Sequence, residues 1–371
     1  MKILLCFGTR PEAIKMAPLY HELKKHSFFE VKVCVTAQHR EMLDQVLDFF
    51  EVLTDYDLDL MQPNQTLNGL SARILKGMDS IFVKYLPDLV LVHGDTTTSS
   101  MVALAAFHHS IKVGHIEAGL RTYNKQAPFP EEMNRQLTSR IADIHFTPTS
   151  KATQNLLDEG ISKNCIVETG NTVIDALFWT IKKIETENYR HPEIEELKNS
   201  IPKGKKIVLV TGHRRENFGD GFKNLCDALC TISERDDVAI VYPVHLNPNV
   251  KQIVYEKLSN KENIHLISPV SYPAFVWLMQ QSFLIVSDSG GIQEEAPSLG
   301  KPVLVTRTVS ERPEGVAAGF SILVGTDPEK IMKTVYSILD HFSGFEKPEN
   351  PYGMGDASQK IISYLKYFKA S

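Results

Sequence analysis

The sequence predicts an α/β protein built from two doubly wound, Rossmann-like domains, and three observations support this fold class. The chain has 371 residues, which exceeds one ordinary domain and suits about two. Short apolar runs alternate with helical stretches, as in parallel sheets with crossover helices. A polar, turn-prone stretch at residues 180–204 separates the two sets of apolar runs.

Ten apolar runs are the expected strands, five in each half of the chain. Many of them end in Gly, Asp or His, where a loop would begin. The runs are residues 3–7, 31–36, 89–93, 113–116 and 144–147 in the first half, and 207–211, 239–243, 264–267, 283–287 and 303–305 in the second.

The domain boundary is expected near residue 170, after the turn at residues 169–171. This gives an N-terminal domain of residues 1–170 and a C-terminal domain of residues 171–356. Residues 357–371 carry apolar side chains at helical spacing and predict a final amphipathic helix.

Charge and cysteine content narrow the functional classes. The formal net charge is −5 with scattered basic residues, so we expect neither nucleic acid nor an anionic membrane as a partner. No segment has the pattern of a secretory signal or a membrane span. The five cysteines lack CxxC spacing, which predicts reduced thiols and a cytoplasmic location. Cys226 and Cys230 lie one helical turn apart and are interpreted as core residues.

Two basic residues, Arg10 and Lys15, lie near the start of the helix that is expected after the first strand. Thr9 and Glu12 have the spacing of a capping box. Capping does not explain Arg10 and Lys15, because a helix N-terminus disfavours positive charge. A bound phosphate would reconcile them with the helix dipole, and the alternative is pairing with other surface charges. Since Pro18 removes a backbone donor, we expect a short turn followed by a helix that begins near Pro18.

Acidic residues follow two successive strands in the first half. Asp95 and Glu117 stand at the strand tips, and Glu131 and Glu132 lie in the loop beyond. Alone, Asp95 would also suit an N-cap, Glu117 a structural carboxylate, and the two glutamates the first turn of a helix that begins at Pro130. Together, at the edge where parallel sheets gather their ligands, they indicate acid–base chemistry.

The second half offers groups for binding phosphate. His213 follows a strand between basic residues and suits phosphate binding or proton transfer, unless it is a structural histidine. Ser289, Gly290 and Gly291 precede a helix and predict an anion cradle. Glu295, one turn further, is suited to a ribose diol. The spacing excludes a P-loop ATPase.

Histidines at strand ends also invite comparison with dinuclear metallophosphoesterases. The paired Asn-His and His-x-His stretches that would complete such a metal site are missing from the sequence. His108 and His109 lie in a helical stretch and are interpreted as a helix end. We therefore expect no metal site at these strand ends.

Several blocks of the sequence resemble one bacterial enzyme family, the non-hydrolysing UDP-N-acetylglucosamine 2-epimerases. The resemblance extends from Lys2 to about Ser358, and the order and spacing of the blocks make it specific. The blocks are FGTRPEAIKMAPL, TAQHREMLDQVL, LVHGDTTT, VGHIEAGLRT, PFPEEMNR, TGNTVIDAL, TGHRREN, YPVHLNPNV, DSGGIQEEAPSLGKPVLV and ERPEGV.

The resemblance implies a glycosyltransferase-B fold, in which two domains face each other across a cleft and the last helix packs back on the first domain. It implies interconversion of UDP-GlcNAc and UDP-ManNAc without NAD or metal, no further cofactor, and a homodimer. Because such a cleft must keep water from the reaction intermediate, we expect it to close on binding the UDP-sugar. The resemblance also implies activation by a second UDP-GlcNAc and a supply of ManNAc units for surface polysaccharide. Alternatives are a hydrolysing epimerase, a glycosyltransferase of the same fold, and a non-catalytic nucleotide-sugar sensor.

The resemblance also implies roles for residues of this chain. The implied catalytic residues are Asp95, Glu117, Glu131 and His213. The implied UDP-sugar contacts are Arg10, Lys15, Phe275 near the uracil, Ser289, Gly290, Gly291, Glu295 and Arg312. The implied activating site contains Gln38, Arg214 and His245.

The chemistry of the substrate explains why such groups are needed. The proton on C2 of the sugar is not next to a carbonyl, so early cleavage of the C1–O bond must make it acidic. Elimination then gives 2-acetamidoglucal and UDP, and UDP adds back. The reaction requires stabilisation of the departing diphosphate, a carboxylate base, and an acid that returns the proton to the opposite face.

Overall fold

A computed structural model describes residues 1–36, 40–62, 65–186, 189–212, 214, 217–345 and 349–368. The chain divides into two compact units: Met1–Ala176 with Tyr352–Ser371, and Leu177–Pro351. Unit 1 thus contains both the start and the end of the chain, and the chain passes into unit 2 and back once. Each unit is a parallel sheet with alternating helices, which confirms the predicted α/β class.

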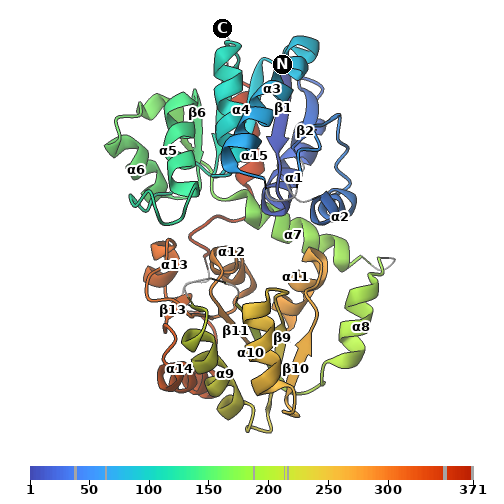
Figure 1. The fold of residues 1–371 in the computed structure, drawn as a ribbon, viewed down its shortest axis with the longest axis vertical. Helices are drawn as coiled ribbons and strands as arrows, with labels where there is room; N and C mark the ends of the chain where they lie inside the picture. The colour runs from blue at the N-terminus through green and yellow to red at the C-terminus, as the bar shows by residue number, and fades with distance from the viewer. Residues whose placement is uncertain are drawn as a thin grey trace. The chain divides into compact units, whose positions relative to one another are not determined.

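Unit 1 holds a seven-stranded parallel sheet in the order β3-β2-β1-β4-β5-β6-β7. Figure 1 labels three of its strands, β1, β2 and β6. Its strands are β1 Lys2–Phe7, β2 Glu30–Val35, β3 Tyr56–Asp57, β4 Leu89–His93, β5 Lys112–Ile116, β6 Ile144–Thr147 and β7 Ile166–Glu168. Its helices are α1 Arg10–Lys24, α2 Arg40–Phe50, α3 Leu67–Tyr85, α4 Thr97–His108, α5 Glu131–Ile141, α6 Ser150–Asp158, the 3-10 turn η1 Lys163–Cys165, and α15 Ala357–Leu365, which contacts α1. Helix α7 (Thr172–Ile184) carries the chain from unit 1 into unit 2.

Unit 2 holds a six-stranded parallel sheet in the order β10-β9-β8-β11-β12-β13. Its strands are β8 Lys206–Thr211, β9 Val238–Pro243, β10 Ile264–Ile267, β11 Leu284–Ser287, β12 Val303–Val305 and β13 Ser321–Leu323. Its helices are α8 Pro192–Ser200, α9 Asp220–Ile232, α10 Pro248–Leu258, α11 Tyr272–Gln281, α12 Gly290–Glu295, the 3-10 turn η3 Ala296–Leu299, α13 Pro313–Ala317 and α14 Pro328–His341.

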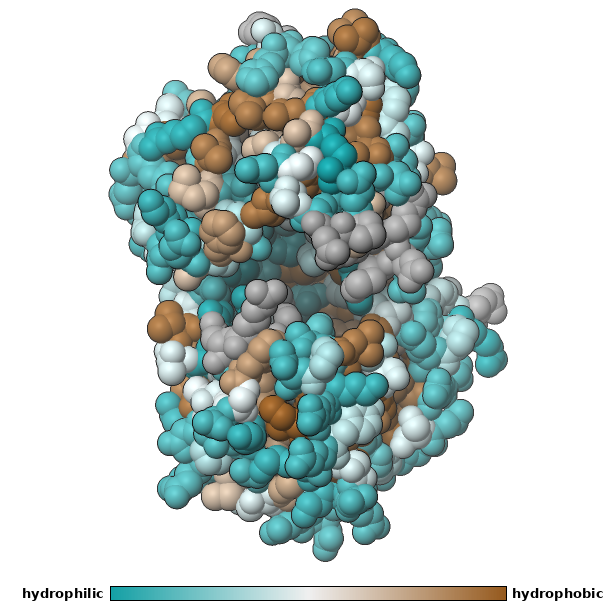
Figure 2. All heavy atoms as spheres, in the orientation of Figure 1, coloured by the Kyte–Doolittle hydropathy of each residue, from teal (hydrophilic) through white to brown (hydrophobic). Residues whose placement is uncertain are grey.

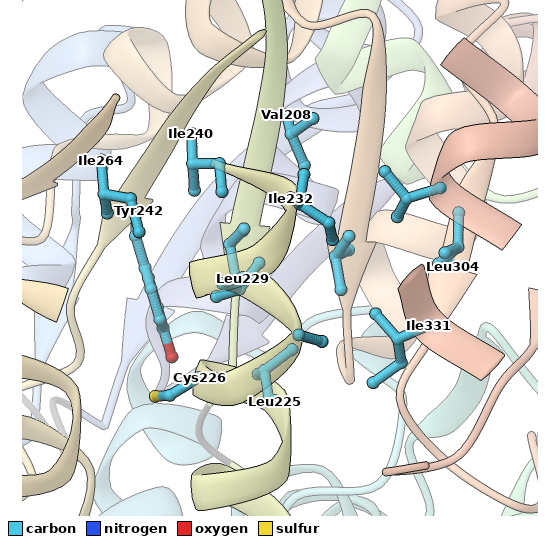
Figure 3. Close-up of a cluster of buried hydrophobic side chains, with 14 of the residues drawn as sticks. Val208, Leu225, Cys226, Leu229, Ile232, Ile240, Tyr242, Ile264, Leu304 and Ile331 are labelled. Carbon is cyan, nitrogen blue, oxygen red and sulfur yellow. The ribbon is translucent and has the colours of Figure 1, made fainter. Parts of the chain in front are cut away.

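The core of unit 2 lies between its sheet and the helices that cover it. Figure 3 shows Cys226 of α9 beside the hydroxyl end of Tyr242 on β9, and Leu225 and Leu229 of α9 belong to the same buried cluster as Ile240 and Tyr242. Cys226 is fully buried and Cys230 packs against the same cluster, which confirms the interpretation of both as core residues. The cysteines are all free thiols.

All ten expected strands occur, and three further strands were missed. The missed strands, β3, β7 and β13, have two or three residues each and lie at the edges of their sheets. A strand this short leaves no apolar run to detect, and an edge strand needs less apolar surface than a central one.

Helix α1 corrects one expectation. It is continuous from Arg10 to Lys24 with Pro18 inside it, so the predicted break before Pro18 is wrong. Proline in a helix interior costs about 3 kcal/mol. Burial of much of the helix, including Ile14, Met16 and Leu19, together with the capping box at its start, outweighs that penalty.

Three neighbouring strands of the unit 1 sheet each carry a histidine. His93 ends β4, His115 lies in β5, and His145 pairs with His115 from β6. All three are buried, and burial lowers their pKa values, to about 4 for His93, about 3 for His115 and about 4 for His145. The folded protein therefore holds these imidazoles in their neutral form at neutral pH.

We expect unit 1 to lose stability as the pH falls from about 6.5, the value for unfolded histidine, toward about 4. In that window the unfolded chain binds more protons than the folded one, so the free energy of unfolding decreases, by on the order of 3 kcal/mol per histidine at most. Glu12 offsets part of this, because burial raises its pKa to about 7 and its stabilising effect grows as the pH falls from 7 toward 4.5. The urea midpoint should be lower at pH 5 than at pH 7, and His145→Gln should reduce the difference. Equal midpoints at both pH values would contradict this expectation.

The face drawn in Figure 2 presents mainly hydrophilic side chains, with exposed apolar residues scattered among them. Such single apolar residues are ordinary on protein surfaces. Within the described ranges, no helix is long and apolar enough to cross a membrane.

Candidate active site

The polar residues of unit 1 gather at one edge of its sheet. All strands of this sheet run parallel, so the loops that follow β1, β4 and β5 leave from the same edge. Arg10 begins α1 after β1, Asp95 follows β4, and Glu117 directly follows β5. Asn171 follows β7 and reaches the same group, because its side chain contacts Glu117.

Glu117 is held by donors from two other elements. Its Oε2 accepts from Lys15 Nζ on α1 and, at 2.8 Å, from Asn171 Nδ2. The Nε2 atom of His93 lies 3.9 Å from the same oxygen. Lys15 was expected to face an anion, and here the anion is this carboxylate. With side chains 12% and 8% exposed, Lys15 and Glu117 form a largely buried ion pair.

The backbone at Glu117 is strained. Its φ of +61° lies in the left-handed region, which an ordinary side chain adopts at a cost on the order of 1 kcal/mol or more. Gly94, with φ of +62°, approaches from the neighbouring loop, and a Cβ there would stand 3.5 Å from Glu117 Oε1. Strain of this kind accumulates at functional sites, because the surrounding contacts hold a conformation that the isolated chain avoids.

Asp95 is oriented by helix α5. Its Oδ2 accepts from Arg135 Nε at 3.0 Å and Nη2 at 2.6 Å, while Asn134 Nδ2 donates to its backbone oxygen at 2.9 Å. The N-cap of α4 is Thr96, whose hydroxyl accepts from Ser99, so Asp95 does not take the capping role that was its alternative. The carboxylate is 26% exposed and thus reachable by a ligand.

Glu131 and Glu132 have different environments, although both lie in the first turn of α5. Glu132 is buried and accepts from the backbone amides of Thr122 and Tyr123 at 3.0 and 3.1 Å. Burial alone would raise the pKa of Glu132, but these and other hydrogen bonds outweigh it and hold the pKa below its usual value. Glu132 therefore stabilises the loop that contains Thr122 and Tyr123. Glu131 is only half-buried, which leaves it the better candidate for chemistry.

A buried carboxylate, Glu12, joins the β1 and β4 loops. Its Oε2 accepts from the backbone amides of Gly8 and Thr9 at 3.0 and 2.9 Å and from the Thr9 hydroxyl, and its Oε1 accepts from Thr96 Oγ1 at 2.7 Å. The predicted capping box is confirmed. The link to Thr96 was not predicted, since nothing in the local pattern indicates a partner 84 residues away. Glu12 thus links the segment before Arg10, which follows β1, to the segment after Asp95, which follows β4.

In unit 2, the expected anion cradle follows β11. Ser289 is the N-cap of α12, and Gly290 lies against Arg312, whose Cζ would be 3.3 Å from a Cβ at that position. Arg312 Nε donates to Glu294 at 2.6 Å, and Tyr272 donates to Glu295 at 2.6 Å. Gly291 lies beside them, since a Cβ there would be 3.9 Å from Ser289 Oγ and 4.0 Å from Glu295 Oε2. Ser289, Gly290, Gly291, Glu295 and Arg312 are thus brought together.

The remaining predicted residues are less connected. Phe275 is half-buried on α11. Arg214 donates its backbone amide to Asp288 at 2.9 Å, whereas His245 is exposed and accepts from the Asn247 amide at 3.1 Å. His213 and Gln38 lie outside the described residues. Where side chains are described, no cluster of three or more His, Cys, Asp or Glu residues could hold a metal ion.

Sequence reasoning missed Arg135, Asn171, Glu12 as a link between loops, and His93 as a neighbour of Glu117. Arg135 and Asn171 belong to blocks already quoted, PFPEEMNR and TGNTVIDAL, so their presence in those blocks was the available signal. Their partners could not be read from spacing, because Asn171 and Glu117 are 54 positions apart.

The amino-acid sequence is similar to that of known enzymes over nearly its whole length. The UDP-N-acetylglucosamine 2-epimerase model matches residues 21–366. The chain is 53% identical over 370 residues to the Escherichia coli (strain K12) UDP-N-acetylglucosamine 2-epimerase, covering 99% of this chain and 98% of that one. The Salmonella typhimurium enzyme of the same name is 52% identical, with 100% of both chains covered.

Solved structures show the same similarity in three dimensions. The Neisseria meningitidis UDP-GlcNAc 2-epimerase bound to UDP-GlcNAc matches with a TM-score of 0.92 at 49% identity, covering 99% of this chain and 100% of that one. The Methanocaldococcus jannaschii enzyme in complex with UDP-GlcNAc and UDP matches with a TM-score of 0.84 at 34% identity, with the same coverage.

Proposed function

Because the chain belongs to the UDP-N-acetylglucosamine 2-epimerase family, we propose that it interconverts UDP-GlcNAc and UDP-ManNAc without hydrolysing them. Membership confirms the resemblance drawn from the motifs. The observation that carries the residue assignments is the gathering of carboxylates at one edge of unit 1. Asp95 and Glu117 follow adjacent strands β4 and β5, and α5, which begins at Glu131, supplies the arginine that holds Asp95.

The proposed reaction is an elimination followed by an addition. A carboxylate takes the C2 proton, the C2–H electron pair forms the C1=C2 bond, and the C1–O bond breaks to release UDP. The protein retains 2-acetamidoglucal and UDP. A second acidic group then delivers a proton to the opposite face of C2 while the diphosphate oxygen bonds to C1 again. Asp95, Glu117 and Glu131 supply the base and the acid.

Unit 2 is proposed to hold the nucleotide. Backbone amides at Ser289, Gly290 and Gly291 and the guanidinium of Arg312 stabilise the charge that develops on the departing diphosphate. Glu295 accepts from the ribose hydroxyls, and Phe275 lies near the uracil. In unit 1, Arg10 adds positive charge for the diphosphate, and Lys15, the partner of Glu117, is a further contact for the UDP-sugar. His213 is assigned to catalysis by resemblance alone.

Regulation, assembly and location complete the proposal. A second UDP-GlcNAc is proposed to activate the enzyme through Gln38, Arg214 and His245, and the protein is proposed to act as a homodimer. The relative from Methanocaldococcus jannaschii, solved with both UDP-GlcNAc and UDP, supports binding of two nucleotide species. Free cysteines fit a reducing compartment such as the cytoplasm. The ManNAc units would serve surface polysaccharide.

One experiment separates this function from its alternatives. The protein is incubated with UDP-GlcNAc in deuterium oxide without NAD, and the products are followed by NMR. We expect deuterium at C2 and the appearance of UDP-ManNAc. Free ManNAc with UDP would indicate a hydrolysing epimerase. An unchanged C2 proton would contradict the proposal and favour a glycosyltransferase or a nucleotide-sugar sensor.

A further inference from the structure

Asn171 is a buried junction between three parts of unit 1. Its side chain donates from Nδ2 to Glu117 Oε2 at 2.8 Å and accepts at Oδ1 from the Val173 amide at 3.0 Å, at the start of α7. Its backbone amide donates to Tyr352 O at 2.7 Å. The residue is 2% exposed.

These contacts fix the orientation of the amide group. The Val173 N–H can only donate, so the oxygen of Asn171 must face it. The NH2 group is then directed to Glu117. A neutral donor can orient the carboxylate without cancelling its charge, which complements Lys15, the cation on the same oxygen.

The backbone around Asn171 leaves it little freedom to move. Gly170, with φ of +87°, lies against Gly353, and a Cβ on Gly170 would approach the Gly353 Cα to 3.2 Å. The segment that holds Asn171 leads into unit 2, and Tyr352 is the first residue of the segment that returns from it. Asn171 therefore connects the side chain of Glu117 to two segments: the one that leads into unit 2 and the one that returns from it at Tyr352.

We propose that Asn171 is a positioning residue for Glu117, which fixes the carboxylate against the reacting carbon. This inference rests on the proposed role of Glu117 in proton transfer. Removing the amide takes away the short, buried donor at Oε2, while Lys15, on a flexible chain, still contacts that oxygen, so the carboxylate is held less rigidly. A misplacement on the order of 1 Å at a reacting group can reduce the rate about 100-fold.

The first test is a double-mutant cycle on the C2 exchange rate. Asn171→Ala should lower kcat about 10- to 100-fold, with KM changed less than about threefold. In the Glu117→Gln background, where the proton-transferring group is already absent, Asn171→Ala should cause little further loss. Independent, multiplicative losses in the two backgrounds would overturn the inference.

The second test uses the pH profile of Asn171→Asp, which keeps the size of the side chain and the acceptor for Val173. A carboxylate beside Glu117 raises the pKa of that pair, so the limb of the kcat/KM profile that depends on Glu117 should move up by about one pH unit or more. Among the described residues, the charged or titratable groups in contact with Glu117 include Lys15 of α1 and His93 of β4. If the kcat/KM profile keeps its shape and position along the pH axis while the rate falls equally at every pH, Asn171 has only a structural role and the inference is overturned.

Thr169→Val is the matched control. Thr169 is buried in the same turn, and its hydroxyl donates to the backbone oxygens of Gly170 at 2.9 Å and Thr147 at 3.4 Å rather than to Glu117. It should lower thermal stability while kcat and the pH profile stay close to those of the unmodified protein. If Asn171→Ala does not fold, Asn171→Asp decides the question alone. If Glu117→Gln exchanges C2 normally, the proposed role of Glu117 fails, whereas normal rates for the Asn171 variants with an inactive Glu117→Gln reject only this inference.

Discussion

Asp95→Asn should stop epimerisation while leaving UDP-sugar binding within about tenfold of its original affinity. The amide has nearly the shape of the carboxylate, and its oxygen can still accept from Arg135. It cannot take or deliver a proton at neutral pH. Loss of a group that transfers a proton commonly lowers turnover by 100- to 10,000-fold, so we expect a decrease of about 1,000-fold or more.

The measurement pairs turnover, from the rate of C2 exchange, with the Kd for UDP-GlcNAc from calorimetry. Asp143→Asn is the control, because Asp143 also pairs with a cation, Lys112, and accepts from the Val113 amide, but stands at the opposite edge of the same sheet. It should retain turnover. Normal turnover in Asp95→Asn would remove Asp95 from the mechanism.

Gly119→Ala should destabilise unit 1 by about 3 kcal/mol. Gly119 has φ of +88°, and a Cβ on it would stand 2.3 Å from the backbone oxygen of Ala152. Backbone atoms cannot rotate away as a flexible side chain does, so the β5 loop or α6 must shift. Because Glu117 is only two residues away, we also expect reduced turnover.

Gly160→Ala separates steric overlap from backbone strain. Gly160 has φ of +79°, but a Cβ there would meet nothing within 4 Å. This variant should lose only about 1 kcal/mol, from the left-handed conformation alone. Urea denaturation of both variants gives the comparison. Equal losses in the two variants would show that the contact with Ala152 has no effect on stability.

The sequence predicted what depends on local pattern. Buried strands such as β4 and β5 are continuous apolar runs, and the residue after each run falls at the ligand-binding edge of a parallel sheet. This is why Asp95 and Glu117 could be named from the chain alone. The capping box at Thr9 was likewise predictable, because its partners are three residues apart.

What the sequence did not predict depends on contacts between distant segments. Lys15 and Glu117 are 102 residues apart, and Asp95 and Arg135 are 40 apart. Only the order of strands in the sheet brings these pairs together. The break expected at Pro18 failed for a related reason, since burial of α1 against the rest of unit 1 exceeds the local preference of proline.

The proposed cleavage of the C1–O bond is tested most directly by isotope scrambling. UDP-GlcNAc carrying oxygen-18 in the bridge between C1 and the β-phosphate is incubated with the protein, and recovered substrate and product are examined by NMR. If UDP leaves and returns, the label should move from the bridge to non-bridging positions of the β-phosphate at a rate comparable with C2 exchange. Retention of all label in the bridge while C2 exchanges would contradict the elimination.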